Sequence, residues 1–161
     1  NESRMPLRTL MRSLDQIGGY KEDPLRKKSN LLALVLAGRP EKFLQLAAGE
    51  QMLPIIDYHL MRSCLRIGLV DVSDPALRQS LVERRLLHPA DEWDVRQAAY
   101  DAISQLATLS GKSMAAVDWF FFKARQRCPE MSMPECSECS LDPVCAHRKE
   151  MFQPVLRSVF Y

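Results

Sequence analysis

Four of the five cysteines in this chain of 161 residues lie in one short stretch near its C-terminal end. They are spaced C-x7-C-x2-C-x5-C, at Cys128, Cys136, Cys139 and Cys145. The stretch has no apolar periodicity, and its prolines prevent a helix from running through it. A loop that buries so little of itself needs another constraint, and thiolates gathered in this way ligate metal centres.

Three kinds of site are compatible with these cysteines. A structural zinc site with four thiolates usually comes as two C-x2-C pairs, and only Cys136 and Cys139 form such a pair. Two disulfides would require an oxidising compartment, whereas the remaining Cys64 lies in an apolar helical pattern, as a cytosolic free thiol would. A [4Fe–4S] cluster requires four sulfurs that converge from one compact loop, and it tolerates uneven gaps. The spacing therefore favours the cluster, followed by zinc and then by disulfides.

Composition limits the class of protein only broadly. A hydrophobic content of 47% suffices for a packed core, and a net charge of +2 does not by itself indicate a nucleic-acid partner. No apolar run approaches the length of a membrane span, and no signal peptide is visible. Together with the cysteine usage, this predicts a cytoplasmic protein. The chain begins with Asn instead of Met, so we expect an upstream segment.

Helical periodicity and capping residues predict an all-α fold. We expect a helical domain over residues 1–126, followed by the cluster loop and a C-terminal tail over residues 127–161. The expected helices cover residues 5–17, 23–38, 39–48, 57–68, 74–87, 91–111 and 113–125, with a last short helix within 147–161.

Asp57 is the residue that we expect to carry catalysis. It follows the apolar residues Ile55 and Ile56 and stands at a natural N-cap position, where a cap alone contributes about 1 kcal/mol. Pro54–Arg66 resembles the segment of helix-hairpin-helix glycosylases in which an apolar run precedes the catalytic aspartate. Those enzymes cleave an N-glycosidic bond, which builds positive charge on the sugar, and an ionised carboxylate beside it stabilises the transition state. The helix N-terminus would keep Asp57 charged, and the carboxylate could also orient a water for attack on C1′. The capping and catalytic roles are compatible.

A second carboxylate, Asp118, interrupts an apolar helical stretch. Burying a carboxylate is costly unless it is paired. We expect Arg96 or a helix terminus to be its partner, in a structural ion pair more readily than in a contact with substrate.

The cysteine loop closely resembles the C-terminal cluster loop of endonuclease III-type, helix-hairpin-helix DNA glycosylases, whose pattern is C-x6-C-x2-C-x5-C. The last two gaps match, and the first gap has one additional residue. Val117–Arg127 resembles the hydrophobic and then basic helix that leads into that loop. The resemblance covers roughly Pro54–Arg148. It implies a helix-hairpin-helix glycosylase fold in an incomplete or minimal version, a [4Fe–4S] cluster, and base excision from DNA.

The same resemblance assigns site residues. The family's catalytic aspartate falls on Asp57, and the positions after it suggest Tyr58, His59 and Arg62 as substrate contacts. A lyase-type enzyme also needs a lysine nucleophile, for which Lys42 is the candidate. The glycine-rich hairpin that carries this lysine in the family is not reproduced here, which favours cleavage without a lysine or a substrate other than duplex DNA.

Two alternatives remain open. Short motifs at Ile56–Leu60, Glu92–Ala99 and Val117–Phe120 resemble queuosine 5′-phosphate N-glycosylases, which act on a modified nucleotide and lack the cysteine loop. The chain could also be a non-catalytic module in which the cluster supports a domain that binds nucleic acid or a protein. The expected partners are DNA or a modified nucleotide, with an upstream segment or second chain completing the fold, and no membrane.

Overall fold

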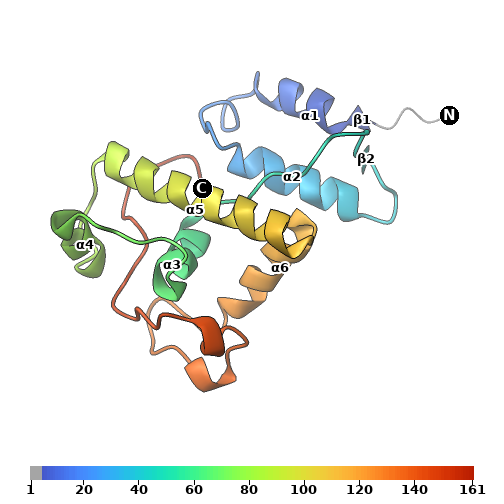
Figure 1. The fold of residues 1–161 in the computed structure, drawn as a ribbon. Coiled ribbons are helices and arrows are strands. Elements are labelled where there is room, and N and C mark those ends of the chain that lie inside the picture. Colours follow the sequence, from blue (N-terminus) through green and yellow to red (C-terminus); the bar gives the residue numbers. More distant parts are fainter. Residues whose placement is uncertain (1–4) are drawn as a thin grey trace.

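The computed structural model describes residues 5–161, and nearly all the regular secondary structure in this part of the chain is helical (Figure 1). The predicted all-α class is therefore confirmed. Within the same residues, no helix has both the length and the apolar character needed to cross a bilayer. The elements, in chain order, are β1 (Met5–Pro6), α1 (Leu7–Leu14), α2 (Lys27–Gly38), β2 (Leu44–Gln45), α3 (Tyr58–Ile67), α4 (Pro75–Val82), α5 (Pro89–Ser110), α6 (Met114–Ala124) and the single turns η1 (Cys136–Glu138) and η2 (Asp142–Val144).

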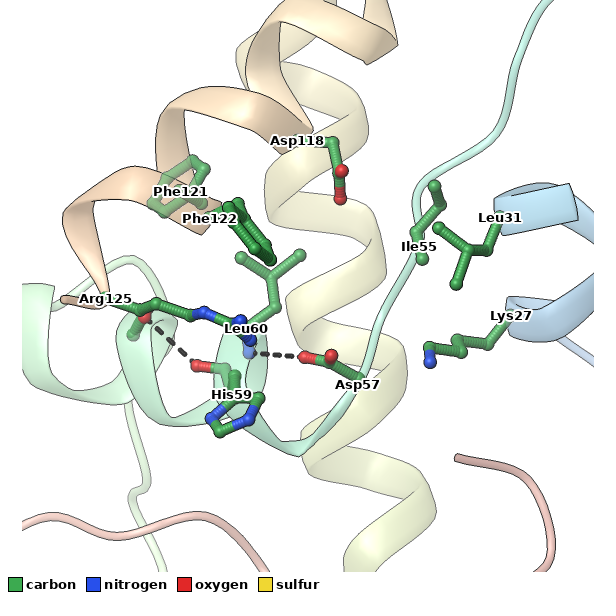
Figure 2. Close-up of a pocket in the computed structure, with 11 residues that line it drawn as sticks. Lys27, Leu31, Ile55, Asp57, His59, Leu60, Asp118, Phe121, Phe122 and Arg125 are labelled. Carbon is green, nitrogen blue, oxygen red and sulfur yellow. Dashed lines mark hydrogen bonds between the residues drawn. The ribbon is translucent and has the colours of Figure 1, made fainter. Parts of the chain in front are cut away.

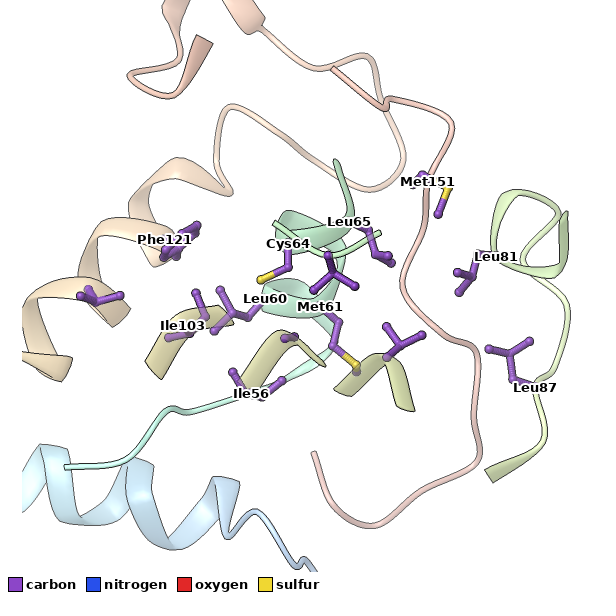
Figure 3. Close-up of a cluster of buried hydrophobic side chains, with 14 of the residues drawn as sticks. Ile56, Leu60, Met61, Cys64, Leu65, Leu81, Leu87, Ile103, Phe121 and Met151 are labelled. Atoms are coloured by element: carbon purple, nitrogen blue, oxygen red, sulfur yellow. The ribbon is translucent and has the colours of Figure 1, made fainter. Parts of the chain in front are cut away.

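The larger hydrophobic core forms around α3, which packs against α5 and α6 (Figures 1 and 3). The side chains that α3 buries here repeat with helical spacing: Leu60, Met61, Cys64 and Leu65. Burial raises the pKa of the Cys64 thiol to about 12. Cys64 is therefore an inert core residue, separate from the four cysteines of the loop.

The N-terminal helices α1 and α2 have a smaller core of their own. A buried ion pair connects them to α5, because Arg96 donates to both carboxylate oxygens of Asp23 at 2.8 Å. Arg96 also donates to the carbonyl of Ile56 at 3.3 Å, and Asp23 accepts the backbone N–H of Lys27 at 2.8 Å. One ion pair thus fixes both the start of α2 and the residue before Asp57.

The predicted helix over residues 39–48 is wrong. The segment forms a turn, in which Lys42 has a left-handed φ of 50°, and then the strand β2. Leu44 is buried where β2 pairs in parallel with β1. The carboxylate of Glu50 accepts backbone N–H groups from both Ala47 and Leu7, so it holds this segment against the start of α1. Tertiary pairing outweighs local helix propensity here.

The predicted C-terminal helix within 147–161 is also wrong. The tail is extended, buries Met151 completely, and runs beside the segment after α4, where Leu87 donates its N–H to the carbonyl of Val155 at 2.8 Å. The second helix begins at Lys27 instead of residue 23, since Arg26 adopts a left-handed conformation before it.

Candidate functional site

The four cysteines of the loop line one cavity. Cys128 follows the end of α6, Cys136 opens η1, Cys139 closes it, and Cys145 follows η2. All of them are unpaired and half-buried. The loop thus brings four cysteines that are spread along the sequence to the lining of one cavity, as a thiolate-bound metal group requires.

Two N–H donors point at these sulfurs. Arg66 of α3 donates from Nη1 to Sγ of Cys128 at 3.3 Å, and the backbone N–H of His147 donates to Sγ of Cys145 at 3.3 Å. Burial raises the pKa of the Cys145 thiol, and the hydrogen bond from His147 acts in the opposite direction. N–H donors to sulfur are a common feature around thiolate-bound metals. The donor set therefore fits a thiolate-ligated metal centre.

A second set of donors overlaps with the first. Ligand atoms of Cys136, Asp142 and His147 lie within 4.8 Å of one another, and Nε2 of His147 lies 2.7 Å from Oδ1 of Asp142. Sulfur, carboxylate and imidazole ligands together suit a single zinc ion. The structure thus offers two overlapping ligand sets, of which the four sulfurs are the larger.

The C-terminal end of α3 holds the cysteine loop. Residues just after Cys145 cross this end, where Ala146 donates its N–H to the carbonyl of Ile67 at 2.8 Å. Gly68 ends the helix with a φ of 92°, and a Cβ added there would lie 2.9 Å from the Cβ of Ala146. Only glycine permits both this conformation and this close approach.

The N-terminal end of α3 opens on a cavity of about 130 Å³ (Figure 2). Asp57 caps the helix, as predicted, because its Oδ1 accepts the backbone N–H of Leu60 at 2.9 Å. The walls come from α2, the segment before α3, α3 itself and α6, and the residues are Lys27, Leu31, Ile55, Asp57, His59, Leu60, Ser63, Asp118, Phe121, Phe122 and Arg125.

The polar groups of this cavity have contrasting charges. Figure 2 shows the amine of Lys27 and the carboxylates of Asp57 and Asp118 pointing toward the same space. Burial, and then the charge of Asp57, raise the pKa of Asp118. Arg96 does not pair with Asp118 as expected, because it is bound to Asp23. Asp118 is therefore a carboxyl that holds its proton more tightly than usual, opposite a second carboxylate and an amine.

The three predicted contact residues after Asp57 have different surroundings. His59 lines the cavity, and burial lowers its pKa. Tyr58 does not line it, and its ring lies 4.0 Å from that of His59 and 6.2 Å from that of Tyr161. Arg62 is buried, 3.2 Å from Oε1 of Gln153 and 3.3 Å from Nδ1 of His59. Arg62 therefore lies in the protein interior, where it contacts the imidazole of His59.

Lys42 lies outside the cavity, and a different lysine lies within it. Lys42 is exposed in the turn before β2. Lys27 stands in the first turn of α2 and reaches the cavity beside Asp57. No sequence pattern indicates Lys27, because it is adjacent to Asp57 only through the contact between α2 and the segment before α3. Arg125 was missed for a similar reason, since its neighbours on the cavity wall are distant in the sequence.

Comparison of the chain with protein-family models, with curated proteins and with solved structures finds no match. The molecule itself defines an all-α protein with two sites at opposite ends of one helix. One site is a four-cysteine cavity, and the other is a cavity with an aspartate, a lysine and a second carboxyl group.

Proposed function

We propose that the protein is an N-glycosylase that cleaves the bond between a damaged or modified base and its sugar in DNA. The observation that carries the proposal is the position of Asp57 at a helix N-terminus in a cavity that also holds Lys27, Asp118 and an aromatic wall. Each of these groups has a role in breaking an N-glycosidic bond. The proposal also draws on the resemblance to helix-hairpin-helix glycosylases.

Asp57 and Asp118 have different roles in this reaction, because one acts as a carboxylate and the other as a protonated carboxyl group. Asp57, stabilised by the N–H groups of α3, stands as a carboxylate near the anomeric carbon and offsets the positive charge that develops on the sugar. Asp118, with its raised pKa, gives a proton to the departing base. Phe121 and Phe122 provide an apolar wall of the cavity against which the base packs. Two carboxyl groups in different environments thus act as stabiliser and as acid.

Lys27 takes the role for which Lys42 was the candidate. When its amine is deprotonated, Nζ attacks C1′ as the bond from C1′ to the base breaks, and the base leaves with the proton from Asp118. The Asp118 carboxylate then takes a proton from the ammonium on C1′ and gives it to O4′ as the bond from C1′ to O4′ breaks, which leaves an open sugar and a protonated Schiff base. Without Lys27, a water oriented by Asp57 attacks C1′ and the reaction is a simple hydrolysis.

We also propose that the four cysteines hold a [4Fe–4S] cluster, which would act as a rigid structural element at the far end of α3. The converging sulfurs and the N–H donors of Arg66 and His147 support this. Unpaired cysteines suit a reducing compartment, and we expect the protein in the cytoplasm.

The alternative substrate is a free modified nucleotide, as in the queuosine 5′-phosphate N-glycosylases. Lys27 and Arg125 both line the cavity and are cationic, so they could bind a 5′-phosphate there. The chemistry at C1′ would be the same, and only the presentation of the base would differ.

A base-release screen tests the proposal. Anaerobically purified protein is incubated with damaged DNA and with modified nucleotides, and free bases are identified by liquid chromatography. We expect release from at least one substrate, and loss of that release in Asp57→Asn. Release that Asp57→Asn leaves unchanged would remove the assignment.

Borohydride trapping tests the role of Lys27. Reduction during turnover should link wild-type protein covalently to DNA, and Lys27→Ala should lose this adduct. Lys28→Ala is the matched control, because the neighbouring amine bonds to the carbonyl of Val159 instead of lining the cavity. An adduct that persists in Lys27→Ala would exclude this nucleophile.

A further inference from the structure

Helix α6 has an exposed face in addition to the face that packs against the hydrophobic core. Its core-facing side chains are Met114, Val117 and Phe121. Trp119 and Phe122, on another face, remain 55% and 41% exposed. A tryptophan side chain that remains this exposed in the folded chain indicates a surface that binds a partner.

The exposed rings form an ordered column. Trp119 and Phe122 are stacked, with centroids 5.3 Å apart and an interplanar angle of 6°. The guanidinium of Arg125 lies over Phe122 at 4.0 Å, and Nζ of Lys123 lies over Trp119 at 5.2 Å. The two rings are therefore stacked directly on each other, and a basic group covers each end of the stack.

The column begins at the cavity that holds Asp57. Arg125 and Phe122 line that cavity, whereas Trp119 and Lys123 lie beyond it along α6. A substrate that reaches the cavity and continues outward would therefore run along this column from Arg125 toward Lys123.

The positive charge of this surface indicates the class of partner that it can bind. Among the described residues, neither Lys123 nor Arg125 takes part in a salt bridge. The stretch from Trp119 to Arg127 is aromatic and basic and contains no acidic residue. Stacked rings flanked by two cations without a salt-bridge partner suit a strand with flat bases and a phosphate backbone.

We propose that the column formed by Trp119, Phe122, Lys123 and Arg125 binds unpaired nucleotides beside the target base. A neighbouring base stacks on the exposed ring of Trp119, displacing the flexible side chain of Lys123, whose ammonium then binds the adjacent phosphate. This inference rests on the proposed function, because the column leads to the proposed active site. It makes the substrate a single strand, or a duplex opened at the target, in preference to a free nucleotide.

Fluorescence anisotropy with a labelled oligothymidylate of about 12 nucleotides tests the column without any chemistry. Trp119→Ala should weaken binding by about 5-fold to 100-fold, the usual effect of one lost base stack. Trp119→Phe should restore most of the affinity. Phe43→Ala is the matched control, since Phe43 is 54% exposed but lies in the turn before β2, and it should bind as wild type does.

The outcomes separate this inference from the proposed function. Wild-type protein that binds the oligonucleotide but releases no base from any substrate would contradict the proposed reaction and leave the column intact. Unchanged binding by Trp119→Ala would overturn the column even if bases are released. A dimer that Trp119→Ala dissociates, with oligonucleotide binding unchanged, would show that the face meets a second copy and would also overturn it.

Discussion

Replacing Arg96 by Met removes the cation of an ion pair that is almost completely buried. The guanidinium and the carboxylate of Asp23 share two hydrogen bonds of 2.8 Å, and their side chains are 0% and 3% exposed. The substitution keeps most of the side-chain volume but leaves the Asp23 charge without its partner. We expect a loss of about 3–5 kcal/mol in the free energy of unfolding, as is typical when one member of a buried pair is removed.

The chain contains a matched control with the same geometry. Arg26 and Asp15 also form a forked pair, with hydrogen bonds of 2.9 and 2.8 Å, but their side chains are 42% and 29% exposed. Solvent screens such a pair, so Arg26→Met should cost less than about 1 kcal/mol. Because Arg96 also donates to the carbonyl of Ile56, the difference between the variants measures the combined effect of burial and of these additional hydrogen bonds.

Urea denaturation followed by far-UV circular dichroism measures both losses. A domain of this size usually has about 5–15 kcal/mol of stability, so Arg96→Met should fold but unfold at a clearly lower urea concentration. Arg96→Lys, which keeps the charge but not the fork, should fall between Arg96→Met and wild type. Equal losses for Arg96→Met and Arg26→Met would refute the assignment of this pair as the link between α2 and α5.

Three further predictions concern the two ends of α3. Cys128→Ser should lose iron and acid-labile sulfide, because one of the four ligands is gone, whereas Cys64→Ala should keep both; equal metal content in the two would exclude Cys128 as a ligand. Gly68→Ala should lower the free energy of unfolding by more than about 1 kcal/mol in urea titrations, since the new Cβ meets Ala146 at a positive φ; wild-type stability would contradict this geometry. Burial raises the pKa of Asp118 above its usual 3.8, so the folded state binds this proton more tightly than the unfolded state does and stability falls as pH rises from 3.8 through the raised value. Asp118→Asn should remove that fall and be more stable than wild type above this range; parallel stability curves across pH would show that the group is not perturbed.

Features that depend on neighbouring residues could be predicted from the sequence. The N-cap role of Asp57 follows from an acid placed directly before a helical pattern, and the structure confirms it. The long helix α5 ends at Gly111, which adopts the left-handed conformation expected of a glycine in that position. Unlike these features, the roles proposed for Asp57 and the cysteines stay predictions.

Features that depend on distant residues could not be predicted in this way. Residues 39–48 have helical propensity, but Leu44 is buried only where β2 meets β1, a contact that no local pattern reveals. Arg96 was expected beside Asp118, yet it reaches Asp23 across the boundary between the two cores. Lys27 lines the cavity beside Asp57 because α2 lies against the segment before α3. The lysine of the candidate site therefore became apparent only from the packing of α2 against the rest of the protein.

The rate of base release under single-turnover conditions tests the central claim most directly. The substrate is the one that the screen identifies, and Asp57→Asn is compared with Asp94→Asn, which changes an exposed aspartate on α5. We predict that Asp57→Asn slows release by about 100-fold or more, the usual effect of removing a group that stabilises transition-state charge, whereas Asp94→Asn releases base at the wild-type rate. Equal rates for the two variants would contradict the account.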